Sequence, residues 1–401
     1  MTWISPRIVR GNRGDIASRY GILKALVVRE TPITAVFASR KDHVPAELRP
    51  RILPYGPLYN LWPGWRGIRA LMRSKAVIWT GGLDLQDDSS LVKLVHTWLV
   101  FLSFRLLGLK ILLALQGAGP LTTGAGRWLT RRILALVHLA LVRDRGSYRL
   151  LGEFMAADRL RLAADGIFLD GFPTRDAPGS IPSTVIALTE AGPRPVVGLN
   201  VRLWFHFANS IIPYQFARDR YRKRAEAPMQ ALLDVIAGTV DDLRTRHQAR
   251  VVLLSMYEPG SDPWEDDVPL LKTIKSRFPH DPDVVLCTED LPIEDLCCLF
   301  GRFDLMIGMR LHSALIALRA GVPALHIAYT LKGRDIYADL GLDEWVIDID
   351  EALRWPKAIT MLVDKLLGDE ECFARVAAIV EPLVAANVAA LMAAVNDVQR
   401  D

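Results

Sequence analysis

The chain has 401 residues, of which 51% are hydrophobic and 23% are charged, and its formal net charge is +4. This length exceeds that of an ordinary single domain, so two domains are expected, and the apolar content excludes a disordered chain. No run of five like charges occurs, and the mild positive charge favours an anionic ligand and argues against a nucleic-acid partner.

The chain start and the cysteines predict neither secretion nor a metal site. Residues 1–14 contain no apolar core of signal-peptide length, so we expect a cytoplasmic protein. Cys297 and Cys298 are adjacent and no C-x-x-C occurs, which suits neither a zinc clamp nor a disulfide framework and favours packing inside a helix. No His and carboxylate pair has trustworthy metal-ligand spacing, so no metal is expected.

The first half alternates short apolar runs with longer helical stretches, which predicts a parallel sheet covered by helices. Residues 91–115 are strongly apolar but are interrupted by basic residues, whereas a membrane-spanning helix needs about 20 largely uncharged apolar residues. We predict a buried helix followed by a strand there, with a helix resting on a membrane surface as the alternative. Strands are expected at 35–39, 76–80, 111–115 and 138–142, with one more at 161–168, and helices at 16–29, 65–74, 90–107 and 126–137.

The second half restarts the same alternation after a segment rich in Pro, Gly, Ser and Thr. We therefore predict an N-terminal Rossmann-like domain over 1–172, a linker over 173–195, a C-terminal Rossmann-like domain over 196–354, and helices over 355–401 that pack back across both domains. The sheets would face each other across a cleft at the carboxyl ends of their strands. Strands are expected at 196–201, 251–255, 284–287, 305–307 and 324–327, and helices at 225–246 and 313–320.

The segment Gly308-Met309-Arg310-Leu311-His312-Ser313 has the pattern of an anion site, because an apolar strand leads into Arg310 and His312 just before a helix start. The alternative is a purely structural role, in which His312 caps the helix and Arg310 pairs with an acidic residue. Arg202 follows the strand at 196–201 and is expected on the same rim. Two guanidinium groups there could hold a phosphate and a carboxylate, although Arg202 could equally form a surface salt bridge.

Three further motifs could contribute to the cleft. Lys332 would add positive charge to the rim of Arg310, unless it only starts a solvated helix. The run GNRGD, with Asn12, Gly14 and Asp15, precedes a helix and could be a ligand loop or simply a turn with an N-cap. Two Gly-rich segments that follow predicted strands could line an acceptor pocket. Neither segment continues as a dinucleotide-binding fingerprint or a P-loop. Their candidate residues are Gly81, Gly82, Asp84, Gln116 and Gly117.

The remaining histidines are not predicted to take part in chemistry. His43, His247 and His280 lie in polar contexts and are expected at the surface. His326 lies within a predicted strand, where a packing role is expected.

These motifs in this order, GNRGD, TGGLD, LQGAGP, VVGLNVR and DLMIGMRLHSALIALRAGVPALHIAY, resemble the polysaccharide pyruvyltransferase family over residues 8–350. The resemblance implies a fold similar to GT-B glycosyltransferases. It also implies that Arg202, Arg310, Leu311 and His312 bind phosphoenolpyruvate. The chain departs from many relatives at Ile16, where they carry an acidic residue, and this bears on the acceptor side.

The resemblance implies transfer of pyruvate from phosphoenolpyruvate to two hydroxyls of a cell-surface or exopolysaccharide sugar, forming a cyclic ketal and releasing phosphate. His312 would be the general acid, and Asp15 or Asp84 would activate the acceptor. No cofactor beyond the co-substrate is implied, the acceptor could be lipid-linked, and peripheral association with the inner face of the membrane stays open. The alternatives are a GT-B glycosyltransferase using a nucleotide sugar and an inert sugar- or phosphate-binding protein.

Overall fold

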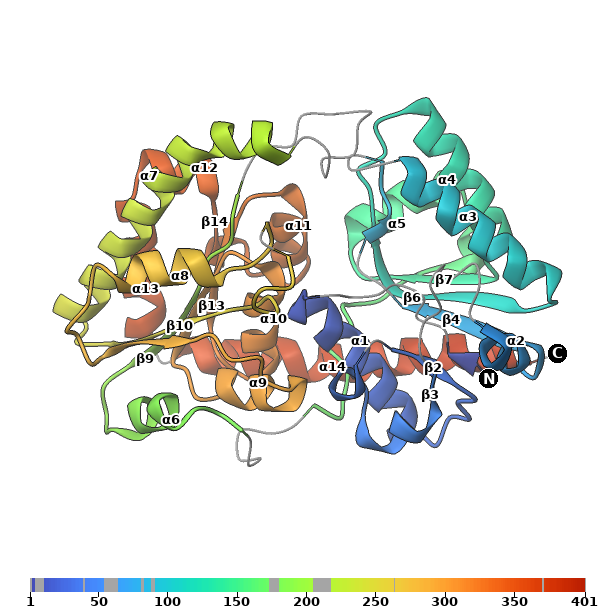
Figure 1. Ribbon diagram of the computed structural model, residues 1–401, viewed down its shortest axis with the longest axis horizontal. Helices are drawn as coiled ribbons and strands as arrows, with labels where there is room; N and C mark the ends of the chain where they lie inside the picture. Colours follow the sequence, from blue (N-terminus) through green and yellow to red (C-terminus); the bar gives the residue numbers. More distant parts are fainter. Residues whose placement is uncertain are drawn as a thin grey trace.

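Two parallel sheets, one in each half of the chain, form the framework of the molecule (Figure 1). The computed structural model describes residues 2–3, 11–38, 40–53, 64–80, 83–87, 91–172, 180–204, 218–262, 264–369 and 371–400. The two halves lie side by side, and their connections include the helix that ends the chain.

The N-terminal sheet has the order β1-β4-β6-β7-β8, and β5 pairs with β6. Alternate residues of β4 point to opposite faces, as the pleat requires: Val77 and Trp79 join one hydrophobic cluster, and Ala76 and Ile78 join another. Helices α2 (Gly64–Met72), α3 (Leu91–Leu106), α4 (Gly124–Leu136) and α5 (Arg145–Gly152) cover the first face, and helices α1 (Arg13–Val28) and α14 (Glu371–Gln399) cover the second. The strands are β1 (Thr2–Trp3), β4 (Ala76–Thr80), β5 (Leu83–Leu85), β6 (Lys110–Ala118), β7 (Leu139–Val142) and β8 (Leu160–Leu162).

The helices of this half are α1 (Arg13–Val28), α2 (Gly64–Met72), α3 (Leu91–Leu106), α4 (Gly124–Leu136) and α5 (Arg145–Gly152). Short 3-10 helices occur at Lys41–His43, Ala46–Arg51 and Ala157–Arg159. The strand predicted at 35–39 is shorter, as β2 (Val36–Phe37), and it pairs with β3 (Ile52–Leu53) in a separate ribbon rather than in the main sheet.

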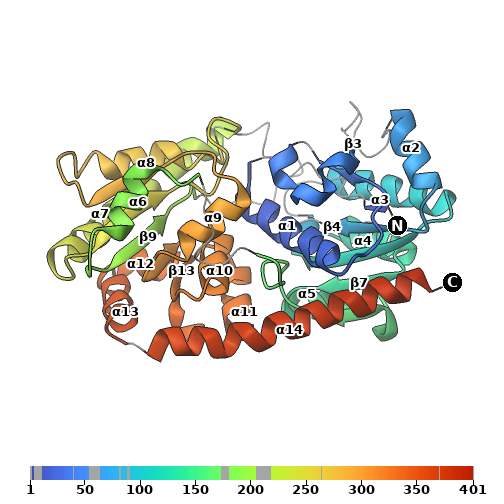
Figure 2. The same cartoon turned by 90° about the horizontal axis from the view of Figure 1, so that it is seen from below.

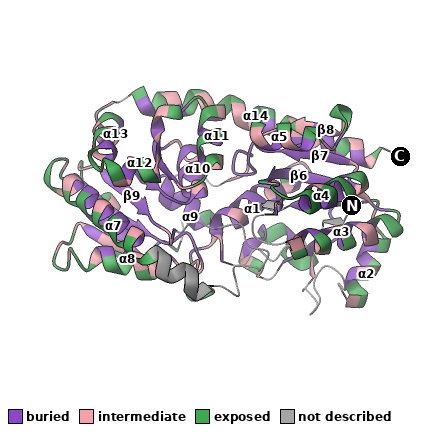
Figure 3. Ribbon diagram, turned by 90° about the horizontal axis from the view of Figure 1, so that it is seen from above, coloured by how far each residue is buried: buried purple, intermediate pink, exposed green. Residues whose placement is uncertain are grey.

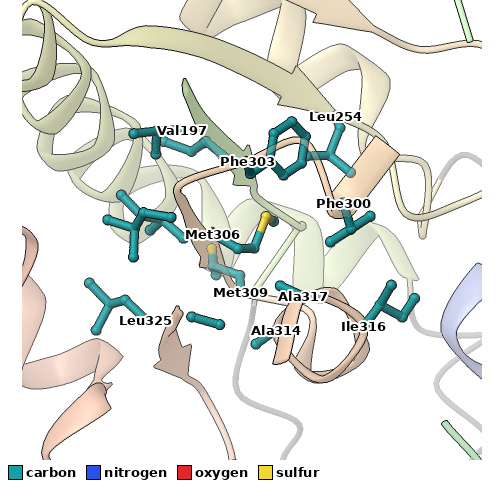
Figure 4. Close-up of a cluster of buried hydrophobic side chains, with 14 of the residues drawn as sticks. Val197, Leu254, Phe300, Phe303, Met306, Met309, Ala314, Ile316, Ala317 and Leu325 are labelled. Atoms are coloured by element: carbon teal, nitrogen blue, oxygen red, sulfur yellow. The ribbon is translucent and has the colours of Figure 1, made fainter. Parts of the chain in front are cut away.

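The C-terminal sheet has the order β11-β10-β9-β12-β13-β14, which is the doubly wound Rossmann order with its first strand, β9, in the middle. Figure 4 shows the core of this half, where Phe300 and Phe303 meet Met306 and residues of α10. The strands are β9 (Val196–Asn200), β10 (Arg250–Leu254), β11 (Val284–Cys287), β12 (Leu305–Gly308), β13 (Ala324–Ala328) and β14 (Val346–Asp348).

The helices of the second half are α6 (Ser183–Glu190), α7 (Arg218–Thr245), α8 (Val268–Lys275), α9 (Ile293–Phe300), α10 (Leu311–Arg319), α11 (Leu331–Asp339), α12 (Ile349–Arg354), α13 (Lys357–Gly368) and α14 (Glu371–Gln399), with a 3-10 helix at Asp343–Trp345. Helix α6 lies inside the segment expected to be an irregular linker. Helix α10 begins at Leu311, so His312 lies in its first turn rather than before it. The cysteines at 297 and 298 are buried in α9, as expected of packing residues.

Helices α1 and α14 join the two halves. Ile16 and Tyr20 of α1 pack into the core of the C-terminal half, whereas Leu23 and Leu26 pack beneath the N-terminal sheet. Figure 2 shows α14 running along both halves, and its last turns reach the N-terminal sheet. Among the described residues, α14 is the one helix long and apolar enough to cross a membrane by length and composition. Its inner residues, such as Leu391 and Val395, are buried between elements of the fold.

Candidate active site

Arg202 and Arg310 follow neighbouring strands at the point where the C-terminal sheet reverses its strand order. Strands β9 and β12 pair with Asn200 opposite Gly308, so the chain leaves both strands at the same edge. In doubly wound folds this crevice is where ligands bind. The side chain of Asn200 reinforces the geometry by accepting a hydrogen bond from the Arg310 backbone N–H at 3.2 Å.

The Arg310 guanidinium is buried and held by Asp267, a residue that no motif or spacing in the sequence points to. Its Nε lies 2.9 Å from Asp267 Oδ2 and its Nη2 lies 2.8 Å from Oδ1, a two-pronged contact. Burial alone would lower the pKa of Arg310, but Asp267 raises it above the usual value, so the cation is permanent. Asp267 also accepts from the Asn200 amide at 3.1 Å and the Met256 N–H at 3.0 Å, which fixes the position of Arg310.

Glu265 lies between the two arginines. Its Oε2 is 3.0 Å from Arg202 Nη2 and 3.3 Å from Arg310 Nη1. Arg202 also donates to the Tyr329 hydroxyl at 2.6 Å. Burial would lower the pKa of Arg202, and the nearby Tyr329 and Glu265 raise it. The structure thus brings the two predicted arginines together, and a carboxylate occupies the position between them.

His312 has its partners in the other half of the molecule. A Cβ on Gly14 would lie 2.2 to 2.5 Å from atoms of the His312 side chain, so only glycine fits where α1 meets α10. The glycine of GNRGD is therefore explained by contact with the histidine of MRLHS, and the two motifs meet at the junction of the halves. Arg310 and His312 are close in sequence, yet their side chains share no partner among the described contacts.

A buried ion pair, Arg143 with Asp165, faces the His312 ring. Arg143 Nη1 is 2.6 Å from Asp165 Oδ2, and His312 Nε2 is 3.4 Å from Arg143 Nη1 and 3.5 Å from Asp165 Oδ2. Burial would raise the pKa of Asp165, but Arg143 and then His312 lower it well below its usual range. The carboxylate therefore stays ionised at neutral pH and can orient a ring proton on His312.

Asp15 lies beside this network at the start of α1. It lines a cavity of about 10 Å³ together with Ser18, Thr80 and Arg143. The space suits roughly one water molecule, so a sugar ring would need further room from movement of the walls. Asn12 caps α1, accepting from the Gly14 N–H at 3.1 Å, and donates to Asp15 Oδ2 at 3.0 Å. The N-cap interpretation of Asn12 is thus confirmed, and Asp15 is held at the edge of the cavity.

The other residues expected on the acceptor side are only partly described. Gly81 and Gly82 lie outside the described residues, as does the side chain of Asp84 in β5. Gln116 and Gly117 belong to β6 itself rather than to a loop, because the strand extends to Ala118. Gln116 is buried and donates to the Trp79 carbonyl at 3.3 Å, and its Oε1 has no hydrogen-bond partner among the described residues.

Lys332 and Leu311 are placed differently from the arginines. Lys332 in α11 donates to the Gly119 carbonyl of the N-terminal half, so it bridges the cleft instead of adding to the arginine cluster. The Leu311 side chain is partly buried and packs against the core of the C-terminal half. Within the described ranges, no group of three or more His, Cys, Asp or Glu is arranged to hold a metal ion.

Two of the other histidines that the structure describes are buried. His326 hydrogen-bonds the Gly308 carbonyl at 2.8 Å and stacks on Tyr337, so the expected packing role is confirmed. The expectation that His43 is a surface residue is wrong, because it is 8% exposed. The fold of the 3-10 segment around it, which the sequence did not predict, encloses the ring.

Sequence reasoning missed four charged residues of the site: Arg143, Asp165, Glu265 and Asp267. Arg143 directly follows β7, so the rule that located Arg202 and Arg310 would have found it. The three acidic residues lie in irregular segments, where no periodic pattern marks them.

The comparison with known families matches most of the chain. A sequence model of the family described as polysaccharide pyruvyl transferase matches residues 12–330. The chain belongs to the polysaccharide pyruvyl transferase family. The matched range begins at the Asn12 cap and ends at Thr330, so it includes Arg202, Arg310 and His312 and stops just before Lys332.

The solved structures similar to this pyruvyl transferase family member share its two-domain fold. A putative UDP-N-acetylglucosamine 2-epimerase from Listeria monocytogenes has a TM-score of 0.61 at 13% identity, covering 100% of this chain and 97% of that chain. HepE from Anabaena, solved with UDP and glucose, has a TM-score of 0.55 at 12% identity, covering 99% and 98%. At this identity the likeness concerns the fold, and it confirms the predicted GT-B-like arrangement.

Proposed function

We propose that this protein transfers the pyruvate unit of phosphoenolpyruvate to two hydroxyls of a sugar in a cell-surface or exopolysaccharide, forming a cyclic ketal. A proton adds to C3 of phosphoenolpyruvate, and C2 becomes electrophilic. One sugar hydroxyl bonds to C2 and loses its proton, the C2–O bond to phosphate breaks, and the second hydroxyl closes the ring and loses its proton. The products are the ketal and inorganic phosphate, and no metal or further cofactor is proposed.

His312 is the proposed general acid that delivers the proton to C3. The observation that carries the proposal is the meeting of GNRGD and MRLHS at the junction of the halves, where Gly14 makes room for the His312 ring. The ionised Asp165 lies 3.5 Å from Nε2 and orients the ring. Asp165 is therefore proposed as a positioning residue, and Arg143 keeps it ionised.

Arg202 and Arg310 are the proposed ligands of the anionic groups of phosphoenolpyruvate. The position of Glu265, whose carboxylate contacts both guanidinium groups, supports this role because it marks where an anion can sit. Asp267 holds Arg310 rigid, so Arg310 would provide a fixed charge against which the carboxylate or phosphate is aligned. Binding of the donor would displace the Glu265 side chain.

The acceptor is proposed to enter from the N-terminal half. Asp15 at the rim of the cavity is the proposed base for a sugar hydroxyl, and Gln116, with its unpartnered Oε1, is a proposed hydrogen-bonding residue. Asn12 and Gly14 would shape this side, with Gly81, Gly82, Asp84 and Gly117 as further candidates. Leu311 and Lys332 are proposed to complete the donor side when the halves adjust around the substrates.

The deciding experiment measures inorganic phosphate released from phosphoenolpyruvate with galactose, glucose, mannose and mannosamine acceptors, each free and lipid-linked. We expect acceptor-dependent release that falls by about 10²- to 10⁴-fold in His312→Ala, as for loss of a general acid. His247→Ala is the matched control, because His247 pairs with Asp364 away from the junction and should retain full activity. Full activity of His312→Ala would remove the general-acid assignment.

Positioning by Asp165 has its own readout. Asp165→Asn keeps the shape but removes the charge, so we expect kcat to fall while KM for phosphoenolpyruvate changes little. The alkaline limb of the kcat–pH profile, where a general acid loses its proton, should also shift to lower pH, because the negative charge beside His312 has been removed. A purely structural Asp165 would lower stability without moving that limb.

A nucleotide-sugar transferase is the second candidate, because HepE is solved with UDP and glucose on the same fold. UDP should then raise the melting temperature of the chain, and phosphoenolpyruvate should not. This result, with no phosphate release for any acceptor, would replace the pyruvyl-transfer proposal.

A further inference from the structure

The outer side of α3 and α4 exposes apolar side chains in a regular pattern. Val95, Leu99 and Leu106 of α3 are 39%, 41% and 80% exposed, and Leu102 between them is half-buried. Their spacing of four, three and four residues places them along one stripe of the helix. The ring of Trp128 on α4 is 51% exposed and lies 6.3 Å, centre to centre, from the ring of Trp98 on α3.

This stripe is a second apolar face on a helix that already has a buried one. Leu94, Phe101 and Phe104 of α3 pack into the core of the N-terminal half. One buried face is enough to dock a helix on its own sheet. Contiguous exposed apolar side chains on a folded chain mark a surface that contacts something else.

The charged residues of α3 and α4 themselves are all basic, and the exposed Glu153, which follows α5, pairs with Arg127 of α4. No Asp or Glu occurs between Ser89 and Arg143, a range that contains both helices. Arg105, Arg131 and Arg132 are exposed, and the Arg132 guanidinium lies 5.3 Å from the centre of the Trp128 ring. Helix α2, which covers the same face of the sheet, adds the exposed side chains of Arg69 and Met72, and the exposed Arg73 follows it. Figure 3 shows the exposed residues on the outer sides of these helices.

We propose that the α3–α4 face, comprising Val95, Leu99, Leu106, Trp128, Arg105, Arg131 and Arg132, docks on the surface of an anionic lipid bilayer. Leucine and tryptophan side chains would enter the boundary between headgroups and acyl chains, and the arginines would contact lipid phosphates. Charge complementarity favours this occupant. The charged residues of α3 and α4 are basic and would be attracted to an anionic membrane, whereas a second copy of the same basic face would be repelled. The proposal goes beyond pyruvyl transfer and does not depend on it.

The end of the face where α4 begins lies toward the cleft, and Leu106 lies at the opposite end. Helix α4 begins at Gly124, directly after the loop whose Gly119 carbonyl accepts from Lys332 of the other half. A bilayer on the α3–α4 face would therefore lie near the mouth of the candidate active site. A lipid-linked saccharide would then reach the cleft without leaving the membrane.

The test is flotation of the full chain with vesicles of phosphatidylcholine alone and of phosphatidylcholine with phosphatidylglycerol. We expect binding to the anionic vesicles that is at least tenfold stronger than to the neutral ones and that weakens as salt is raised. The Leu99→Glu/Leu106→Glu and Arg131→Glu/Arg132→Glu variants should each lose at least tenfold in binding. Met361→Glu and Lys272→Glu, on exposed positions of α13 and α8, are the matched controls and should bind as the unmodified chain does.

Phosphate release with a free sugar acceptor separates this proposal from the proposed function, because both face variants should keep it. Absence of flotation with anionic vesicles would overturn membrane docking even if the enzyme is active. If Met361→Glu and Lys272→Glu lost as much vesicle binding as the face variants, the assignment of binding to the α3–α4 face would be overturned. A dimer in light scattering that both face variants dissociate, without vesicle binding, would assign the face to a second copy and also overturn the proposal.

Discussion

Glycine at position 14 is the residue on which contact between α1 and α10 depends. The His312 side chain occupies the space that any Cβ would need. Gly14→Ala should displace the ring or separate the helices, and we expect kcat to fall by about 10²-fold, the effect of a misplacement of roughly 1 Å. The overpacking should also lower the free energy of unfolding by about 1–3 kcal/mol.

Steady-state phosphate release and urea unfolding measure the two effects of Gly14→Ala. Gly238→Ala in α7 is the matched control, because a Cβ there meets nothing within 4 Å. Unchanged kcat in Gly14→Ala would mean that the position of the His312 ring is not important for turnover.

In the proposed function, Glu265 competes with the donor for the arginine pair. Glu265→Gln removes the charge that contacts Arg202 and Arg310. Partly exposed ion pairs contribute about 0.5–1 kcal/mol, so we expect KM for phosphoenolpyruvate to fall by roughly two- to fivefold. Glu190→Gln, which alters an exposed pair with Arg302, is the control. A rise in KM would show that Glu265 assists binding instead of opposing it.

At the scale of elements, α14 holds the segment that carries Asp165. The Asn387 side chain accepts from the Ala164 N–H and donates to the Asp165 and Phe168 carbonyls, each at 2.9 Å. Asn387→Ala leaves these buried backbone groups without their partner, so the free energy of unfolding should fall by about 2–4 kcal/mol. Because the segment also positions Asp165, kcat should fall as well.

Urea unfolding and phosphate release of Asn387→Ala should be compared with those of Asn396→Ala on the same helix. Asn396 is exposed, so its replacement should change the free energy of unfolding by less than about 0.5 kcal/mol. Equal stability of the two variants would show that α14 is not anchored through Asn387.

The sequence predicts an element correctly where a continuous apolar run is compatible with one conformation only. Strands β4 and β11 agree with the predicted ranges, because continuous apolar residues in a parallel sheet leave no competing interpretation. Helix α6, strand β3 and the pairing of β2 with β3 outside the main sheet were not predicted. Their short segments have weak local patterns, and contacts with distant parts of the chain decide their conformation.

At the scale of the whole molecule, stability should depend on two buried neutral histidines. Burial lowers the pKa of His43 and of His326 from 6.5 to about 4. The fold favours the neutral form of each histidine, whereas the unfolded chain takes up a proton near pH 6.5. The free energy of unfolding is therefore unaffected by these histidines above pH 6.5 and decreases as the pH falls toward 4. Each should reduce the free energy of unfolding by about 2 kcal/mol between pH 7.5 and pH 5.

Urea unfolding at pH 7.5 and pH 5.0 measures this loss. In His326→Gln, the difference between the free energies of unfolding at pH 7.5 and pH 5.0 should be smaller by about 2 kcal/mol than in the unmodified chain. This holds whatever the stability of the variant at pH 7.5. His280→Gln, at an exposed position, should show the full difference. An unchanged difference in His326→Gln would mean that His326 is not the titrating group.

The amino-acid sequence by itself determined the fold class, the family and the rim on which Arg202 and Arg310 lie. These follow from local patterns, since an apolar run defines a strand and the residue after it must emerge at the carboxyl edge of a parallel sheet. The pairing of charges was decided only by the tertiary structure. Asp165, Glu265 and Asp267 come from irregular segments. The contact of Asp165 with His312 exists only once the halves pack together, and the contacts of Glu265 and Asp267 with the arginines exist only once the C-terminal half has folded. Electrostatic contacts depend on the distance between charges in space, so the spacing of residues along the chain does not predict which charges meet.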